Sequence, residues 1–303
     1  MKGVILVENS FVHPYMPNSV PENKKAMLDE LGINSVEDIY KSIIPDELLY
    51  KERLDIPEPI RSEYELKRHV MGILNRDITT EEYTSFLGAG CYKHQVPAIC
   101  DEINSRGEFL TAYCGDTYSD HGKMQAIFEY TSMMGELLDT DVVSYTTYDG
   151  GQAVASSLRM AVRAVREKGM AGKVILVPKT MNPEIYSQVV QYCRNVAEVR
   201  KIAYEPETGL MDLEELKEQL AKKNVAAVFF ENPTYLGNFE TRGEEIAKLA
   251  HDAGAYCVVQ TEVAALGIME SPVNQGADIV CGDIQPLGMH IQFGGGQAGF
   301  IAC

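Results

Sequence analysis

The sequence predicts a three-layer α/β sandwich preceded by a helical segment. After residue 141, short β-rich runs alternate with helical patterns, which is typical of parallel strands joined by helical crossovers. Before residue 140, helix signals dominate. A length of 303 residues is sufficient for two structural units. We therefore expect a helical N-terminal segment over residues 1–85 and an α/β domain over residues 86–303.

Capping signals mark helices in the N-terminal segment. Ser35 lies three residues before Asp38, and Ser62 lies three residues before Glu65. In this spacing the serine hydroxyl accepts a backbone N–H of the first helical turn. Each serine is therefore expected to precede an amphipathic helix.

The α/β part consists of alternating strands and helices, each identified from its pattern of apolar residues. The short β-rich runs are expected to be buried strands because helices follow most of them and would cover both faces of the sheet. The expected strands are residues 142–148, 174–178, 199–204, 226–230, 256–260 and 277–282, and the expected helices are residues 153–169, 184–193, 213–223 and 243–254.

The charge balance argues against nucleic acid as a partner. The chain has 27 Lys and Arg against 44 Asp and Glu, which gives a formal net charge of −17. No run of basic residues forms a face that could neutralise successive phosphates. We therefore predict no binding of nucleic acid.

Cysteine usage and the N-terminal residues indicate a cytoplasmic protein. The seven cysteines are an odd set without a CxxC pair, which is typical of reduced thiols in a protein core. The apolar run before Glu8 is too short for a secretory signal. No apolar stretch approaches the roughly 18 residues that a membrane helix needs. We predict a cytoplasmic location and no membrane association.

Three common catalytic or binding patterns are missing or incomplete. The six histidines include no metal-ligand spacing such as HExxH, so no metal site is expected. There is no GxSxG motif, which leaves a Ser-His-Asp triad with little support. Gly294, Gly296 and Gly299 match GxGxxG, but too few residues follow for the helix that would bind a pyrophosphate. We expect this segment to be a turn and return of the backbone.

The segment YDGGQAVAS, residues 148–156, is a more specific signal. It follows an expected strand and opens an expected helix, so Gly150 and Gly151 would allow a tight turn and leave the first helix amides, near Gln152, able to bind a phosphate. In the alternative interpretation this is an ordinary turn in which Asp149 caps the helix. The Asp149 charge would also repel a closely held phosphate. The residues alone leave both interpretations open.

Six segments together carry a resemblance to a known family. They are FLGAGCYKHQVP (86–97), EFLTAY (108–113), MQAIFEYTSMM (124–134), YDGGQA (148–153), ENPTYLGNFE (231–240) and GADIVCGDIQPLGMHIQFGGGQAGF (276–300). In this order they resemble subunit 1 of the two-subunit glycine dehydrogenase (decarboxylating), the N-terminal half of the glycine cleavage system P protein. The resemblance implies a fold-type I architecture, like that of aspartate aminotransferase. It also implies a further C-terminal domain, so we expect the chain to be truncated at its C-terminus.

The resemblance implies pyridoxal-phosphate chemistry that is divided between two subunits. In this family glycine is decarboxylated on pyridoxal phosphate, and its aminomethyl group passes to the lipoyl arm of the H protein. A lysine must hold the cofactor, yet the last lysine here is Lys248, and Gln285 lies near the expected place. Glu262 is the acid nearest to the position where the fold commonly carries an Asp. The resemblance therefore implies that glycine dehydrogenase subunit 2 carries the lysine and the cofactor, and we assign no catalytic residue to this chain.

Tyr92, Lys93 and His94 are candidates for contact with the substrate or the partner subunit. Aromatic, cationic and imidazole groups in a glycine-rich loop suit the lining of a cleft. The alternative is a solvated loop. Two functions follow: the chain supports glycine decarboxylation with its own side chains, or it is a non-catalytic pseudo-subunit that only stabilises its lysine-bearing partner.

Overall fold

The chain forms two compact units, Met1–Asp77 and Ile78–Cys303. The computed structural model describes residues 12–50, 52, 55–86, 92–107 and 121–303.

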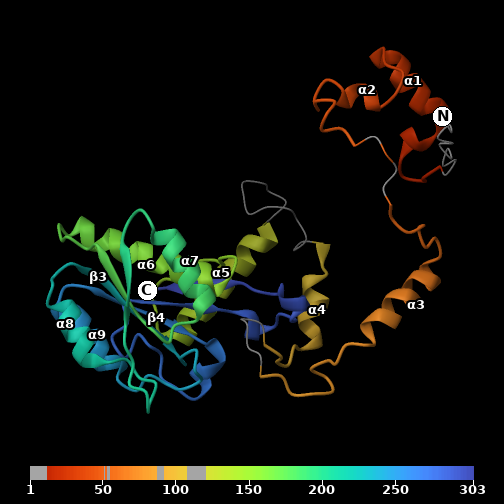
Figure 1. Cartoon of the computed structure of the whole chain (residues 1–303). Helices are drawn as coiled ribbons and strands as arrows, with labels where there is room; N and C mark the ends of the chain where they lie inside the picture. Colours follow the sequence, from red (N-terminus) through yellow and green to blue (C-terminus); the bar gives the residue numbers. More distant parts are fainter. Residues whose placement is uncertain (1–11, 51, 53–54, 87–91, 108–120) are drawn as a thin grey trace. The chain divides into compact units, whose positions relative to one another are not determined.

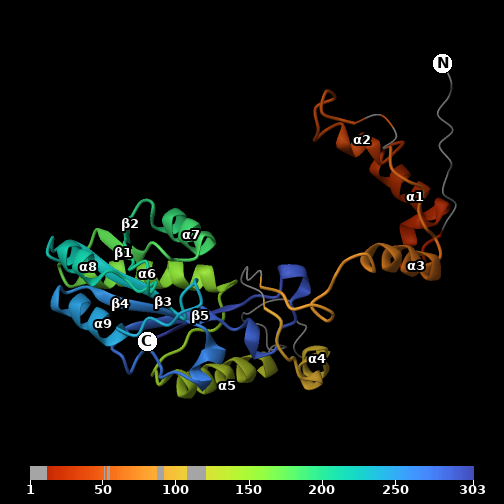
Figure 2. The same cartoon turned by 60° about the horizontal axis from the view of Figure 1, so that its bottom comes forward.

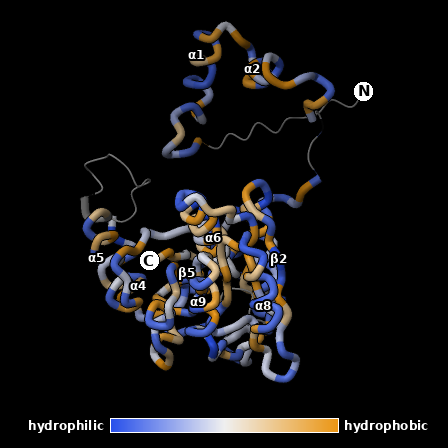
Figure 3. The backbone as a smooth tube through the Cα atoms, turned by 90° about the vertical axis from the view of Figure 1, so that its left-hand side faces the viewer, coloured by the Kyte–Doolittle hydropathy of each residue, from blue (hydrophilic) through white to orange (hydrophobic). Residues whose placement is uncertain are grey.

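The first unit consists of short helices: η1 (Pro17–Ser19), α1 (Pro21–Leu31), α2 (Glu37–Tyr40) and α3 (Glu63–Leu74). The capping prediction is confirmed for Ser62, whose hydroxyl accepts the N–H of Glu65 at 3.4 Å. It is wrong for the Ser35 hydroxyl, because α2 begins after Val36 without a side-chain cap; only the reverse contact forms, in which Asp38 accepts the N–H of Ser35 at 3.0 Å. No residue of α1, α2 or α3 is buried. Figure 3 shows both hydrophobic and hydrophilic residues along this unit.

The second unit contains the α/β domain that the alternating pattern predicts. The expected helices and strands from residue 153 onward are confirmed, with bounds that differ by a few residues. In chain order the elements are α4 (Ala98–Asn104), α5 (His121–Leu138), α6 (Gly150–Glu167), β1 (Val174–Pro178), α7 (Pro183–Cys193), β2 (Glu198–Ile202), α8 (Leu213–Leu220), β3 (Val225–Asn232), α9 (Gly243–Asp252), β4 (Tyr256–Thr261), η4 (Val263–Gly267), β5 (Ile279–Asp283), η5 (Gln285–Leu287), η6 (Gln292–Gly294) and β6 (Gly299–Ala302).

The six strands form one sheet in the order β2-β1-β3-β4-β5-β6. The first five are parallel, as helical crossovers require. Strand β6 runs antiparallel to β5, with Asp283 opposite Gly299. The glycine-rich segment between them therefore turns the backbone and returns it, which confirms the prediction for Gly294 to Gly299.

The sheet has a hydrophobic core on each face, which confirms the three-layer arrangement (Figures 1 and 2). Successive side chains of a strand point to opposite faces, so Phe229 packs in one core and Phe230 in the other. One core contains the buried sides of α6 and α7. The other contains those of α8 and α9 and the end of α5. The carboxyl ends of the parallel strands meet at one edge of this sandwich.

The expected strand over residues 142–148 is wrong as a continuous element. It makes only isolated antiparallel bridges, from Val143 to Ala302 and from Thr147 to Gly299. Between them the Ser144 hydroxyl, rather than a backbone carbonyl, accepts the N–H of Ile301 at 3.2 Å. The side chain thus competes with the ladder for this donor, and regular pairing is interrupted there.

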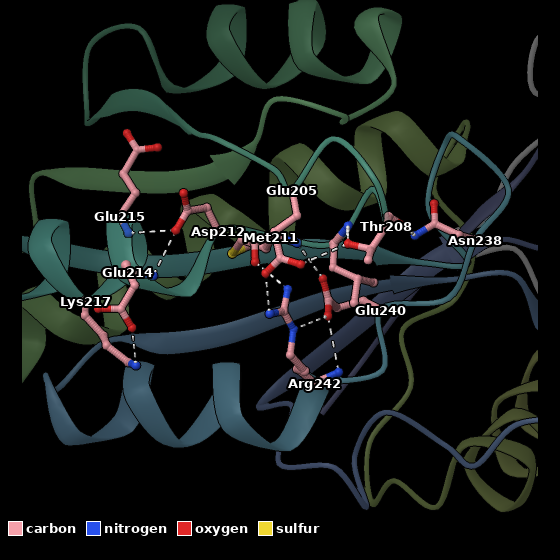
Figure 4. Close-up of polar contacts among 11 residues, drawn as sticks. Glu205, Thr208, Met211, Asp212, Glu214, Glu215, Lys217, Asn238, Glu240 and Arg242 are labelled. Atoms are coloured by element: carbon pink, nitrogen blue, oxygen red, sulfur yellow. Dashed lines mark hydrogen bonds and ion pairs between the residues drawn. The ribbon is translucent and has the colours of Figure 1, made fainter.

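A buried polar network joins the connections that follow β2 and β3 (Figure 4). The Glu240 carboxylate is 4% exposed and accepts the N–H groups of Met211 at 2.9 Å and Arg242 at 3.2 Å. The Arg242 guanidinium donates to the Met211 carbonyl at 2.6 Å and to Glu205 at 2.8 Å, and lies 3.5 Å from Glu240. This network fixes both connections at the edge of the sheet where the strands end.

The buried cysteines are core residues, as predicted. Cys193, Cys257 and Cys281 are buried free thiols. Burial raises the pKa of Cys193 to about 11 and that of Cys281 to about 12, so both stay protonated.

Over the ranges given above, no helix is both long and apolar enough to cross a membrane. Within the same ranges, no group of three His, Cys, Asp or Glu side chains could hold a metal ion.

Candidate functional site

A cleft of about 120 Å³ lies at the carboxyl ends of β3, β4 and β5. This is the place where open α/β sheets bind ligands, because loops and helix N-termini surround the strand ends. The starts of α6 and α7 form its walls. Its lining residues are Tyr92, Asp149, Gly150, Gly151, Asn182, Glu184, Ile185, Gln188, Pro233, Gln260, Thr261, Glu262, Asp283 and Gln297.

The start of α6 is bound by carboxylates of the chain itself. The Asp149 side chain accepts the N–H of Gln152 at 2.5 Å, so the interpretation of Asp149 as the helix cap is confirmed. The N–H of Gly150 donates to Asp283 at the end of β5, at 3.1 Å. The Gln152 amide oxygen turns back and accepts the N–H of Tyr148 at 2.8 Å. Two of the amides that would bind a phosphate therefore already have anionic partners.

The cleft is strongly acidic. Asp149, Glu184, Glu262 and Asp283 line it, and none of its described lining residues is Lys or Arg. Burial raises the pKa of Asp283, and the Asp149 charge adds to this rise. Burial also raises the pKa of Glu262. This set of groups does not fit the phosphate of pyridoxal phosphate, which needs free N–H donors and positive charge.

Gly150 is required by its contact with β5. A Cβ at this residue would lie 3.1 Å from the Cβ and 3.2 Å from the backbone nitrogen of Asp283. At Gly151 a Cβ would instead lie 2.5 Å from the side-chain oxygen of Gln188, which is the flexible end of its side chain. The close approach expected at this turn thus comes from the chain's own strand and helix.

We expect Gly150→Val to lower the free energy of unfolding by about 1–3 kcal/mol, because the Asp283 backbone cannot move without disturbing β5. Gly151→Ala should cost less than about 1 kcal/mol, because Gln188 can change its rotamer. Urea unfolding of the two variants beside the parent chain measures the difference. Equal losses of stability in both variants would show that the contact with β5 is not the reason for a glycine at residue 150.

Gln285 connects the strand end to the loop that carries Tyr92. Its side chain is fully buried, and its oxygen accepts the N–H of Tyr92 at 3.3 Å. Its amide nitrogen donates to the carbonyls of Tyr92 at 3.0 Å and Met289 at 3.1 Å. Its backbone N–H donates to Asp283 at 2.7 Å. At the place where the family resemblance leads one to expect a lysine, the structure has an amide that fixes the Tyr92 backbone.

The three candidate loop residues lie at two neighbouring sites. Tyr92 lines the cleft together with Gly150 and Gly151. Lys93 and His94, and also Tyr92, line an adjacent groove of about 620 Å³ with residues 80–85. The Lys93 ammonium donates to the Thr80 carbonyl at 2.6 Å and lies 3.2 Å from Glu81. The Nε2 atom of His94 is buried and has no hydrogen-bond partner among the residues that the structure describes.

Glu231 fixes the start of α7, which forms one wall of the cleft. It is 5% exposed, and its carboxylate accepts the N–H of Asn182 at 3.1 Å and that of Tyr235 at 3.3 Å. Asn182 in turn caps α7 by accepting the N–H of Glu184 at 2.9 Å. Burial raises the pKa of Glu231 to about 7, from its ordinary value of about 4.5.

Glu231 should make the protein less stable as the pH rises from about 4.5 to about 7. In that range the folded chain holds a proton that the unfolded chain has released, so each step up in pH favours unfolding. The full effect is about 3 kcal/mol. Glu231→Gln should remove this pH dependence, which chemical unfolding at several pH values measures. A variant with the parent's slope between pH 4.5 and 7 would contradict the role of Glu231.

The sheet order, the two helical layers and the cleft at the strand ends define a fold-type I α/β protein, the fold of aspartate aminotransferase-like pyridoxal-phosphate enzymes. A sphingosine-1-phosphate lyase from Burkholderia pseudomallei shares this fold, with a TM-score of 0.58 over 86% of this chain and 63% of that chain at 13% identity. The family model of the glycine cleavage system P-protein matches residues 13–303. The chain belongs to this family, which confirms the resemblance of its segments.

Relatives in the family cover nearly the whole chain. It is 35% identical to a probable glycine dehydrogenase (decarboxylating) subunit 1 from Staphylothermus marinus, over 96% of this chain and 62% of the relative. It is 38% identical to the protein of the same name from Pyrococcus horikoshii, over 95% of this chain and 62% of that relative. The crystal structure of an inhibitor-bound glycine decarboxylase (P-protein) matches with a TM-score of 0.78 at 31% identity. The match covers 96% of this chain and 62% of that chain. The chain thus spans about 62% of the length of these proteins.

Proposed function

We propose that this chain acts as subunit 1 of a two-subunit glycine dehydrogenase (decarboxylating) of the glycine cleavage system. In this role it supports pyridoxal-phosphate-dependent decarboxylation of glycine and transfer of the aminomethyl group to the lipoyl H protein. Its partner is subunit 2, and we place the complex in the cytoplasm. Membership of the P-protein family over residues 13–303 supports the proposal. The observation that carries it is the cleft, which occupies the ligand position of the fold but lacks the groups that would hold the cofactor.

We assign the cofactor and its lysine to subunit 2. Three features of this chain support the assignment: Gln285 cannot form a Schiff base, no lysine follows Lys248 in the sequence, and the turn at Gly150 to Gln152 is bound by Asp149 and Asp283. We describe this turn as a degenerate phosphate site. The reaction chemistry is accordingly assigned to the partner.

The side chains that this chain contributes are Tyr92, Lys93 and His94. The backbone of Tyr92 is held at the cleft by Gln285. The buried Nε2 of His94 has a hydrogen-bonding capacity that no described residue uses. A partner or a substrate could satisfy it. The ion pair of Lys93 with Glu81 favours instead the second function, that of a pseudo-subunit without a part in the chemistry.

Reconstitution distinguishes these functions. The chain, subunit 2 and lipoylated H protein are combined, and the exchange of bicarbonate carbon into glycine is followed. We expect exchange only when both subunits are present, and full exchange from subunit 2 and H protein alone would refute the proposal. His94→Gln should lower kcat if the loop acts on substrate, while unchanged kcat in a stably assembled complex would favour the pseudo-subunit. Lys248→Gln, an exposed substitution on α9, serves as the control.

A trapping experiment tests where the cofactor is held. We expect that borohydride treatment with pyridoxal phosphate labels one lysine of subunit 2 and no single lysine of this chain. This chain should not be labelled because its cleft is acidic and residue 285 is an amide, which cannot form a Schiff base. Mass spectrometry of each subunit after digestion provides the measurement. One stoichiometric adduct on this chain alone would overturn the assignment.

A further inference from the structure

A groove of about 670 Å³ lies on the outer face of α6, on the side opposite to the residues that pack on the sheet. Tyr192, in the last turn of α7, and Val196, just after that helix, form its second wall. Three arginines from successive turns of α6 line the groove among apolar side chains. We call it the arginine groove, and its lining residues are Ser156, Arg159, Met160, Val162, Arg163, Arg166, Glu167, Tyr192 and Val196.

The arginines are fixed in place but are only partly neutralised. Arg159 donates to the carbonyl of Tyr192 at 3.0 Å, and Arg166 donates to the carbonyl of Val196. Among the residues that the structure describes, neither of these guanidinium groups has a carboxylate partner, whereas Arg163 pairs with Glu167 at 2.8 Å. A guanidinium has five N–H donors, so most of them remain for a ligand. Because the side chains are already ordered, binding would cost little further side-chain entropy.

Basic residues are concentrated in the stretch of sequence that contains the groove. Residues 159–201, which include the second half of α6, all of α7 and most of β2, hold nine Lys and Arg against three Glu, although the whole chain has a net charge of −17. An acidic partner is therefore repelled by the rest of the surface and attracted to this part of it. Such complementarity directs encounter toward one face.

We propose that the arginine groove is a docking surface for an acidic segment of another protein. Arg159, Arg163 and Arg166 extend over two turns of α6, about 10 Å, which matches several carboxylates along a chain better than one small anion. The partly exposed Met160 and Tyr192 beside them belong, with Arg, to the residue types enriched at protein interfaces. This inference does not depend on the proposed function.

Binding of a labelled peptide tests the proposal. The probe is fluorescein-labelled octaglutamate, added to the full chain while fluorescence anisotropy is recorded at low and at physiological salt. We expect binding that weakens with salt, and a loss of about tenfold or more in Arg159→Gln/Arg166→Gln. Since both arginines also hold the end of α7, Arg163→Gln is the second variant. Over the described residues, the contact found for Arg163 is with the Glu167 side chain and not with a backbone carbonyl, so its loss should weaken binding without disturbing the fold.

A matched control distinguishes binding in the arginine groove from the effect of the protein's net charge. Lys217→Gln/Lys222→Gln, on and just after α8, removes the same charge and should leave binding within about twofold of the parent. Equal weakening in the two double variants would overturn the proposal, as would failure of the parent to bind octaglutamate. Tighter binding of single-stranded DNA or of inorganic phosphate in the same assay would also overturn it. Self-association that the arginine variants abolish would identify the occupant as a second copy and refute a separate partner.

Discussion

Replacing Arg242 with methionine should lower the free energy of unfolding by about 3 kcal/mol. The substitution removes the only guanidinium beside Glu240 that the described residues provide, and leaves a carboxylate that is 4% exposed without its cation. It also removes the donors to the Met211 carbonyl and to Glu205. Urea or thermal unfolding of the chain measures the loss.

The control for this prediction is an exposed ion pair. Arg163 and Glu167 lie 2.8 Å apart with 81% and 64% of their side chains exposed, so Arg163→Met should change stability by no more than about 0.5 kcal/mol. The double variant Arg242→Met/Glu240→Gln should regain part of the loss, because it no longer buries an unpaired charge. A loss in Arg242→Met as small as that in Arg163→Met would mean that the network contributes little.

Replacing Gln285 with leucine is expected to have the second large effect. Leucine has a similar size but removes three hydrogen bonds and leaves the backbone groups of Tyr92 and the carbonyl of Met289 without this partner. We expect a loss of about 2–4 kcal/mol, because three hydrogen bonds of a fully buried side chain are removed. Hydrogen exchange should become faster over residues 92–96, because the start of that loop is no longer held.

Gln188→Leu is the matched control, because Gln188 lines the same cleft from α7. It should leave exchange in residues 92–96 unchanged. In the reconstituted complex, Gln285→Leu should also reduce glycine exchange if the loop contributes side chains to the reaction. Unaltered hydrogen exchange in Gln285→Leu would show that the amide does not hold the loop.

Most of the α/β domain could be predicted from the sequence because its strands are buried on both faces and its helices are amphipathic. Both conditions leave a clear pattern of apolar residues, as in residues 174–178 and 225–232, where every residue is buried. Residues 142–148 carry the same kind of pattern. No continuous strand forms there because the Ser144 hydroxyl accepts the N–H of Ile301, which a regular strand would pair with a backbone carbonyl. The spacing of apolar residues gives no information on such a side-chain contact.

The candidate site could be predicted only in part. The turn at Gly150 and the cap by Asp149 involve neighbours in the sequence, so their pattern is local. The contact of Gln285 with Tyr92 joins residues 193 positions apart, and that of Asp283 with Gly150 joins residues 133 apart. A single sequence carries no signal for such pairs. The sequence therefore indicated the missing lysine at Gln285 but not what the amide does in its place.

The position of Gln285 has a consequence for how such a protein can change over time. Under the proposed function, a reversion to lysine at this residue would introduce a Schiff-base group but would remove the bonds that hold Tyr92. The carboxylates of Asp149 and Asp283 would still oppose the phosphate. A single substitution at residue 285 would thus lose these hydrogen bonds without completing a cofactor site. The dependence on a second subunit is therefore difficult to reverse by individual mutations.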